Sequence, residues 1–265
     1  GGTIVSLDHG SGAVPDAEAA LGVLRKAGEF LREKGYSYSV DLIFGDAGCD
    51  SSDISPAEWM RLTEKINEAV SRGVTKILVI HGTDTMAYTA AWLSLTADPA
   101  AAVVLTGSQR TPEAPDFDGE TNLCGAASLL CETDCGVYIH FDGANYEGPF
   151  VHKEDAEALA AYTSTGRGAA PRNYGRRISM PKDGDWRRAA GEMELVVLHP
   201  AALPRFEPRK IIILAGYGAG NMPQRLHRLM AEVFPDDGCR PLVIAASSCA
   251  RGRKNPSFYG GVGIA

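Results

Sequence analysis

Three short apolar runs constrain the fold of this chain. They are Lys76–Ile80, Ala102–Leu105 and Val137–Phe141, and each is followed by a polar turn that contains glycine. Amphipathic stretches separate the runs. This alternation is typical of a parallel sheet whose strands are joined by helices. We therefore expect an α/β fold, with binding groups gathered where the strands end.

The segments before the first of these runs predict two helices and one strand. Ala17–Glu33 has helical periodicity, and Tyr38–Phe44 reads as a strand. Ser55 and Glu58 form a capping box, with Pro56 at the first helical position. The apolar residues that follow recur at helical spacing until Gly73, which predicts the end of this helix.

The pattern divides the chain into two α/β domains. We expect a larger N-terminal parallel-sheet domain with flavodoxin- or Rossmann-like layering, and a smaller C-terminal α/β domain. The predicted boundaries are 1–198 for the first domain, 199–208 for a proline-punctuated linker and 209–265 for the second domain. Residues 166–185 predict a long loop. Within the second domain we expect strands at Lys210–Leu214 and Pro241–Ala245, with a helix from Pro223 to Val233.

Composition excludes several classes of function. A net charge of -7 and a pI near 5.4 argue against a general nucleic-acid surface. No apolar stretch approaches the ~20 residues that span a bilayer. Six scattered histidines and six cysteines lack the spacing of a metal site or a disulfide scaffold. We therefore expect reduced thiols, no metal, no cofactor and no membrane partner.

Two glycine-bearing strings each hold a threonine in a turn. They are GGTI at residues 1–4 and HGTDTM at residues 81–86, the latter directly after an apolar run. A strand-to-helix turn presents backbone N–H groups and a helix dipole that favour developing negative charge. Two threonines, an aspartate and oxyanion donors suggest nucleophilic acyl transfer, in which Gly2 and Thr83 N–H groups would face the oxyanion.

These strings resemble the TGGTI and HGTDTM signatures of bacterial-type L-asparaginases. The resemblance implies that Thr3 is the nucleophile that attacks the side-chain amide of asparagine. It also implies a second catalytic group of Thr83, Asp84 and a lysine, for which the best candidate is Lys153 in PFVHK. A threonine hydroxyl is a weak nucleophile, and this group would supply a proton relay.

The resemblance extends over nearly the whole chain and names further substrate-binding residues. Ser51 takes the family's carboxylate-binding position, and Ser52 the next, amino-group-facing one. Gly2 and Gly82 would let the substrate approach the backbone closely. Asn221 resembles an asparagine that a neighbouring subunit contributes, which implies a homodimer or homotetramer.

Some positions depart from the family pattern. The stretch from Ile4 to Arg25 contains no tyrosine, although members carry one in a mobile loop soon after the nucleophile. That stretch is more similar to the loop in the asparaginase-like subunit of archaeal tRNA-dependent amidotransferases. No acidic residue lies between Cys249 and Ala265, which weakens a periplasmic-type assignment. We expect the sequence to begin inside its first motif and the C-terminal domain to be truncated.

We therefore interpret the chain as a cytoplasmic, type I-like L-asparaginase that acts on asparagine or glutamine. Two alternatives stay open: an amidotransferase subunit that supplies ammonia to a partner, and a non-catalytic amino-acid-binding protein. A dinucleotide-binding loop at Gly216, Gly218 and Gly220 is disfavoured, because Asn221 stands where the fingerprint needs glycine.

Overall fold

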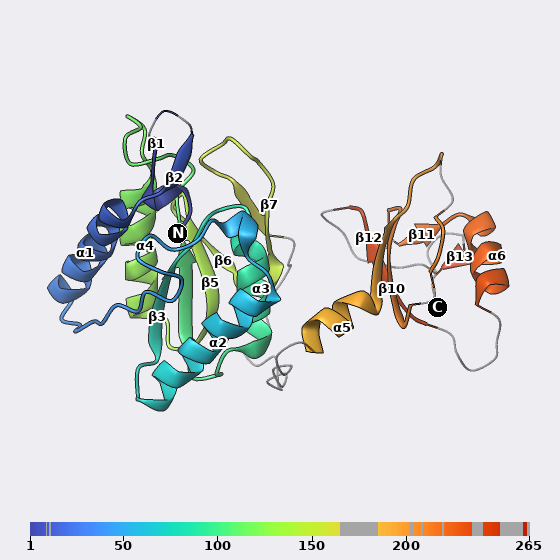
Figure 1. Ribbon diagram of the computed structural model, residues 1–265, viewed down its shortest axis with the longest axis horizontal. Coiled ribbons are helices and arrows are strands. Elements are labelled where there is room, and N and C mark those ends of the chain that lie inside the picture. The colour runs from blue at the N-terminus through green and yellow to red at the C-terminus, as the bar shows by residue number, and fades with distance from the viewer. Residues whose placement is uncertain are drawn as a thin grey trace. The chain divides into compact units, whose positions relative to one another are not determined.

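The computed structural model describes residues 1–8, 10, 12–164, 185–201, 204–207, 209–218, 220–234, 241–249 and 262–263. The chain divides into two compact units, residues 1–180 and residues 181–265 (Figure 1). The loop predicted at 166–185 lies outside the described residues except for Asp185, which begins a helix.

The core of the first unit is a four-stranded sheet in the order β3-β4-β5-β6. Its strands are β3 (Lys76–Ile80), β4 (Ala102–Thr106), β5 (Gly136–Phe141) and β6 (Ala144–Glu147). The first three are parallel, and β6 returns antiparallel to β5. The three strands predicted from apolar runs are confirmed. All five residues of β4 are buried, as expected for a strand covered on both faces.

Helices cover both faces of this sheet, which gives three layers (Figure 1). Side chains of α2 (Pro56–Ser71) and α3 (Met86–Thr96) pack with one apolar cluster of strand residues, among them Val103, Leu105 and Ile139. On the other face, α4 (Gly119–Glu132) packs on residues such as Val104, and α1 (Ala17–Glu33) packs with Leu123 of α4 and with Leu78 and Ile80 of β3. The predicted α/β class with a parallel core is confirmed.

The local sequence accounts for where the first two helices begin. The Asp16 carboxylate caps α1 by accepting hydrogen bonds from the N–H groups of Glu18 and Ala19, at 2.9 Å each. At α2 the predicted capping box forms: the Ser55 hydroxyl oxygen accepts from the backbone N–H of Glu58, and the Glu58 carboxylate accepts from the N–H of Ser55. These contacts satisfy donors that a helix start leaves free.

Short elements complete the first unit. A turn of 3₁₀ helix at Thr3–Val5 leads into an antiparallel hairpin, and another hairpin carries the candidate lysine. These elements are β1 (Ser6–Asp8), β2 (Ala13–Pro15), η2 (Ser51–Asp53), η3 (Gly148–Phe150), β7 (Val151–Lys153) and β8 (Tyr162–Ser164).

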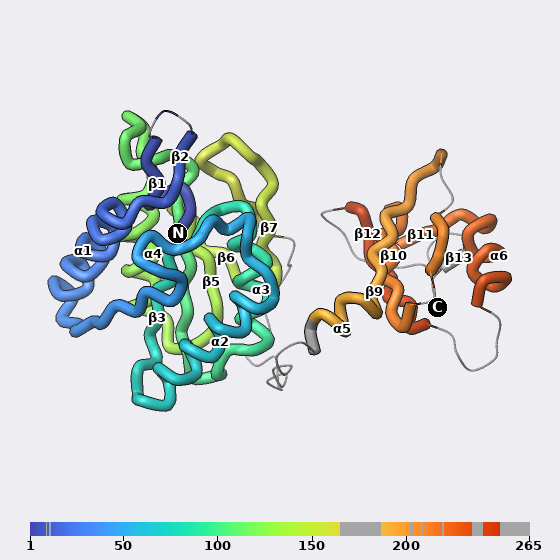
Figure 2. Tube along the Cα trace, viewed as in Figure 1, coloured from blue at the N-terminus to red at the C-terminus, as the bar shows by residue number. Residues whose placement is uncertain are grey.

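The strand predicted at Tyr38–Phe44 is wrong. This segment is irregular and joins no sheet among the described residues (Figure 2). Side-chain contacts hold it instead: the Tyr38 ring fills the space beside Gly28, and Phe44 packs on the sheet cluster. Val40 and Leu42 are exposed, so the alternating pattern marks no buried face. Ser51 therefore follows an irregular segment and not a strand.

The second unit has a parallel sheet in the order β12-β10-β9. The strands and helix predicted in this region are confirmed, within a few residues. Because β9 pairs with β10, it belongs to this unit, although our predicted first domain extended to residue 198. The elements are α5 (Asp185–Gly191), β9 (Met193–Val197), β10 (Ile211–Gly216), β11 (Asn221–Met222), α6 (Gln224–Val233), β12 (Leu242–Ser247) and β13 (Val262–Gly263).

Candidate active site

The two threonine-bearing turns meet through their glycines. A side-chain carbon built on Gly2 would lie 2.2 Å from Cα of Gly82, and one built on Gly82 would lie 2.5 Å from Ser51 Oγ. Gly2 also has a φ of 83°, which glycine adopts without strain. Only glycine at both positions allows the Thr3 turn, the Thr83 turn and Ser51 to approach this closely.

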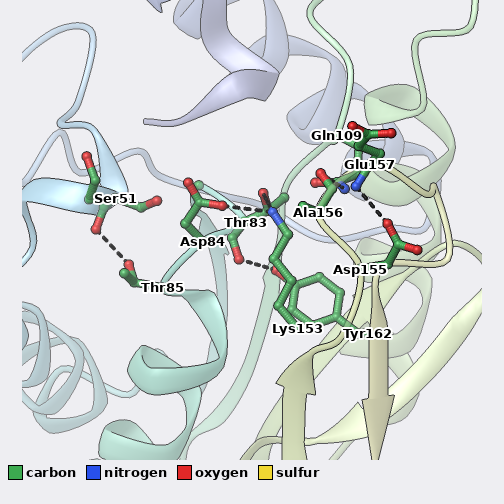
Figure 3. Close-up of polar contacts among 12 residues, drawn as sticks. Ser51, Thr83, Asp84, Thr85, Gln109, Lys153, Asp155, Ala156, Glu157 and Tyr162 are labelled. Carbon is green, nitrogen blue, oxygen red and sulfur yellow. Dashed lines mark hydrogen bonds and ion pairs between the residues drawn. The ribbon is translucent and has the colours of Figure 1, made fainter.

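Lys153, at the end of β7, reaches the turn between β3 and α3. Its Nζ donates to Thr83 Oγ1 at 2.9 Å and to Asp84 Oδ1 at 2.8 Å (Figure 3). The Lys153 side chain is 17% exposed, whereas the Asp84 side chain is 68% exposed. The structure therefore brings together three of the predicted residues, with the lysine shielded and the carboxylate facing outward.

Hydrogen bonds hold the tip of the loop between β7 and β8 in place. Gln109 Nε2 donates to the carbonyls of Ala156 and Ala158, at 3.1 Å each. The Asp155 carboxylate accepts from two N–H groups of its own turn, and these bonds lower the pKa of that carboxyl (Figure 3). These contacts hold the loop that follows Lys153.

Tyr162 lies opposite Lys153 in the β7–β8 hairpin, and it touches the same turn. Its hydroxyl donates to the carbonyl of Thr83 at 2.5 Å. Burial, together with the negative charge of Asp84, raises the pKa of this phenol. Tyr162 is therefore a hydrogen-bond donor throughout the physiological range of pH.

A buried network also fixes His81, which is 5% exposed. Its Nδ1 lies 2.7 Å from the Gly82 carbonyl, so Nδ1 carries the proton. Its Nε2 then accepts from Thr89 Oγ1 at 2.8 Å, and Trp59 Nε1 donates to that same hydroxyl. Burial lowers the pKa of the His81 imidazole to about 4, which keeps the ring neutral.

The two serines differ in their surroundings. Ser51 is buried, and its carbonyl accepts from Thr85 Oγ1 at 2.7 Å (Figure 3). Ser52 is exposed, and its hydroxyl donates to Asp50 Oδ1 at 3.0 Å. Thr3 opens the 3₁₀ turn and is half-buried. Ser51 thus packs where Gly2 and Gly82 meet, whereas Ser52 is exposed in the same 3₁₀ turn.

Asn221 lies in the second unit, in β11 after the glycine-rich turn. Its Oδ1 is buried and has no hydrogen-bond partner among the described residues. Its predicted contribution to a neighbouring subunit stays a prediction.

Within the described ranges, no group of three or more histidine, cysteine, aspartate or glutamate side chains is arranged to hold a metal ion. None of the helices in this part of the chain combines the length and apolar character that crossing a bilayer needs.

Sequence reasoning missed three residues of this site: His81, Gln109 and Tyr162. His81 belongs to the HGTDTM string, but the string itself indicates no role for it. The other two reach the site from loops or strands far away in the sequence, 79 positions in the case of Tyr162 and Thr83. No local pattern marks such contacts.

Comparisons with known proteins agree with the sequence signatures. The family model "Asparaginase, N-terminal" matches residues 1–183. A glutamyl-tRNA(Gln) amidotransferase subunit from Methanococcus vannielii is 34% identical over 294 residues, which cover 98% of this chain and 66% of that protein. The L-asparaginase of Thermococcus kodakarensis is 28% identical over 278 residues, covering all of this chain and 80% of the relative.

Solved structures share the fold. The thermostable L-asparaginase from Thermococcus kodakarensis has a TM-score of 0.73 at 24% identity, covering 98% of this chain and 82% of the other. A probable cytoplasmic L-asparaginase from Campylobacter jejuni has a TM-score of 0.70 at 22% identity, with coverage of 94% and 82%. This chain spans less than two thirds of the length of the amidotransferase relatives, 66% of the first and 40% of one from Methanococcus maripaludis.

The neutral His81 ring predicts a pH dependence of stability. An unfolded histidine takes up its proton near pH 6.5, whereas folded His81 does so only near pH 4. Between these values the unfolded state binds more protons, so the free energy of unfolding falls as the pH is lowered, by roughly 3 kcal/mol in all. Urea unfolding at pH 7, 6, 5 and 4 measures this loss. His81→Gln should show a smaller decline, and identical slopes for the two proteins would contradict the buried neutral ring.

Proposed function

The chain belongs to the asparaginase family, a family of amidohydrolases, and from this premise we propose that it is an L-asparaginase. It would hydrolyse L-asparagine to L-aspartate and ammonia. The observation that carries this proposal is the pair of hydrogen bonds from Lys153 to Thr83 and Asp84. A lysine shared between a hydroxyl and a carboxylate suits proton transfer, because it can take a proton from one partner while the other orients it.

In the proposed reaction, Thr3 Oγ1 attacks the side-chain amide carbon of the substrate and gives its proton to the relay described below. The relay returns that proton to the amide nitrogen, the C–N bond breaks, ammonia leaves, and an ester links the aspartyl group to Thr3. Water hydrolyses this ester, which releases aspartate and restores the threonine hydroxyl. The free N–H groups of the Gly2 and Gly82–Thr83 turns would stabilise the oxyanion that forms in both steps.

Thr83, Asp84 and Lys153 form the proposed proton relay. Thr83 Oγ1 and Lys153 Nζ would exchange a proton along their contact at 2.9 Å, and Asp84 would hold the ammonium form of Lys153 through the contact at 2.8 Å. The low exposure of Lys153 limits the access of bulk water to its contact with Thr83. The exposed side of Asp84 would remain free for the α-amino group of the substrate, beside Ser52, with Ser51 at the α-carboxylate.

Localisation and assembly are part of the proposal. The likeness to a probable cytoplasmic L-asparaginase supports a cytoplasmic enzyme. We propose a homodimer or homotetramer in which Asn221 completes the neighbouring site. The unpartnered, buried Oδ1 of Asn221 supports a role for this side chain beyond the packing of its own unit.

A second candidate function is the ammonia-supplying subunit of a tRNA-dependent amidotransferase. The 34% identity with the Methanococcus vannielii protein favours it, since that relative is more similar in sequence than the L-asparaginase from Thermococcus kodakarensis. Both functions require the same amide hydrolysis. They differ in whether asparagine or glutamine is the preferred substrate. The two substrates differ by one methylene, which a binding pocket can discriminate by about 1 to 3 kcal/mol. A non-catalytic amino-acid-binding protein would bind either substrate without releasing ammonia.

An ammonia-release assay with asparagine and glutamine separates these functions. For L-asparaginase we expect higher kcat/KM with asparagine, and higher kcat/KM with glutamine indicates the second candidate.

Thr3→Ala and Thr83→Val should each lower kcat by about a thousandfold or more, because each hydroxyl belongs to a unit that acts together. Lys153→Met should lower kcat strongly with little change in KM.

Cys135→Ser, an exposed substitution outside the site, is the control and should leave both constants unchanged. Near-normal turnover by Thr3→Ala would contradict the assignment of Thr3 as the nucleophile. Normal turnover by Lys153→Met would contradict the role of Lys153 in the proton relay.

The shared site predicts complementation between inactive chains. Asn221→Ala and Thr3→Ala chains should each be inactive, but mixed oligomers should recover partial activity, because some pairs contain one intact site. Exchange between oligomers is followed with affinity tags of two kinds. Proven exchange without recovery, or an active monomer by light scattering, would contradict the shared site.

A further inference from the structure

Two consecutive carbonyls in the turn 82–84 accept hydrogen bonds from buried side chains. The Gly82 carbonyl accepts from His81 Nδ1 at 2.7 Å, and the Thr83 carbonyl accepts from the Tyr162 hydroxyl at 2.5 Å. Each donor residue is 5% exposed. Neither donor has a role in the reaction proposed above.

These bonds determine where the N–H groups of the turn point. The chain has no cis peptide bond among its described residues, and in a trans peptide the N–H lies opposite the carbonyl of the same plane. The N–H of Thr83 therefore points away from His81, and the N–H of Asp84 points away from Tyr162. Neither N–H donates to a protein acceptor within the described part of the chain.

We propose that His81 and Tyr162 are positioning residues that clamp the two peptide groups of this turn and aim the N–H groups of Thr83 and Asp84 at the reacting amide. The proposal rests on the amidohydrolase function above. It adds the N–H of Asp84 to the oxyanion donors named there and identifies the groups that orient the Thr83 and Asp84 donors. Preorganised donors stabilise developing charge without reorganising during the reaction, so their orientation affects kcat more than substrate binding.

The β7–β8 hairpin couples this clamp to the proposed relay. Lys153 and Tyr162 are direct cross-strand partners, so their side chains lie on one face of the hairpin. One reaches the hydroxyl of Thr83 and the other reaches its carbonyl. A single pair of residues thus fixes Thr83 at two atoms.

The Tyr162 ring is itself held from two sides. It packs edge-on against Phe141 with a centroid separation of 5.0 Å, and Tyr146 lies 6.3 Å away on the same measure. The Tyr146 hydroxyl donates to the carbonyl of Tyr162 at 3.0 Å. Removing the Tyr162 hydroxyl therefore leaves the ring in place and deletes one donor.

The test compares Tyr162→Phe with Tyr146→Phe. Each substitution removes one phenol that donates to a backbone carbonyl, but only the first carbonyl belongs to the turn. We expect Tyr162→Phe to lower kcat by about 10- to 100-fold, with KM changed by less than about threefold. Tyr146→Phe keeps its ring beside Tyr162 and leaves the Tyr162 hydroxyl on the turn, so it should lower kcat far less than Tyr162→Phe does. Thermal unfolding should report similar stability losses for both.

His81 provides a second pair of variants. Asn places an N–H near the position of Nδ1, whereas Gln places its amide near Nε2 and loses the donor to Gly82. We expect His81→Asn to retain more of the wild-type kcat than His81→Gln. The reverse order would contradict the role assigned to Nδ1.

Crystal structures of the two tyrosine variants give a readout that does not depend on activity. The Thr83 carbonyl should rotate in Tyr162→Phe and stay in place in Tyr146→Phe. A wild-type protein that releases no ammonia refutes the proposed function, and the carbonyl orientation alone then decides the clamp. An active wild type with equal kcat in both variants, or an unmoved Thr83 carbonyl in Tyr162→Phe, overturns the clamp.

Discussion

The contact between Gly2 and Gly82 is the constraint on which the site depends. A single added carbon at Gly2 would lie 2.2 Å from the Gly82 backbone, closer than any non-bonded carbon pair allows. The two turns that carry Thr3 and Thr83 can therefore meet only without side chains at these positions. Ser51 also packs against Gly82, so three separate segments of the chain meet there.

Two side chains of the β7–β8 hairpin also hold Thr83 in place. Lys153 and Tyr162 lie 70 and 79 positions from Thr83 in the sequence, and they bind the hydroxyl and the carbonyl of that one threonine. His81, directly after β3, adds a bond to the carbonyl of the neighbouring residue, Gly82. Because these donors are shielded from water, the turn keeps one geometry before a substrate arrives, which is the arrangement that lowers a barrier through fixed dipoles.

The sequence predicted the elements whose signals are local. The capping box at Ser55, the helix Ala17–Glu33 and the runs that became β3, β4 and β5 all carry their own periodicity and end signals. The strand expected at Tyr38–Phe44 failed because a strand needs partners that a pattern cannot supply. Lys153 was found through family resemblance alone. The bond from Tyr162 to the Thr83 carbonyl arises only when distant segments pack, so no pattern revealed it. The bond from His81 to the Gly82 carbonyl is local, but the HGTDTM string does not indicate which way the ring is turned.

In the proposed mechanism, Thr3 forms a covalent bond with the substrate while Thr83, Asp84 and Lys153 transfer protons. Rapid acid quenching during turnover of L-asparagine, followed by peptide mass mapping, tests it most directly. We expect an aspartyl ester on Thr3 that forms as ammonia is released and disappears as aspartate accumulates, and that is absent in Thr3→Ala. An ester on Thr83, or ammonia release by Thr3→Ala at the wild-type rate, would contradict it.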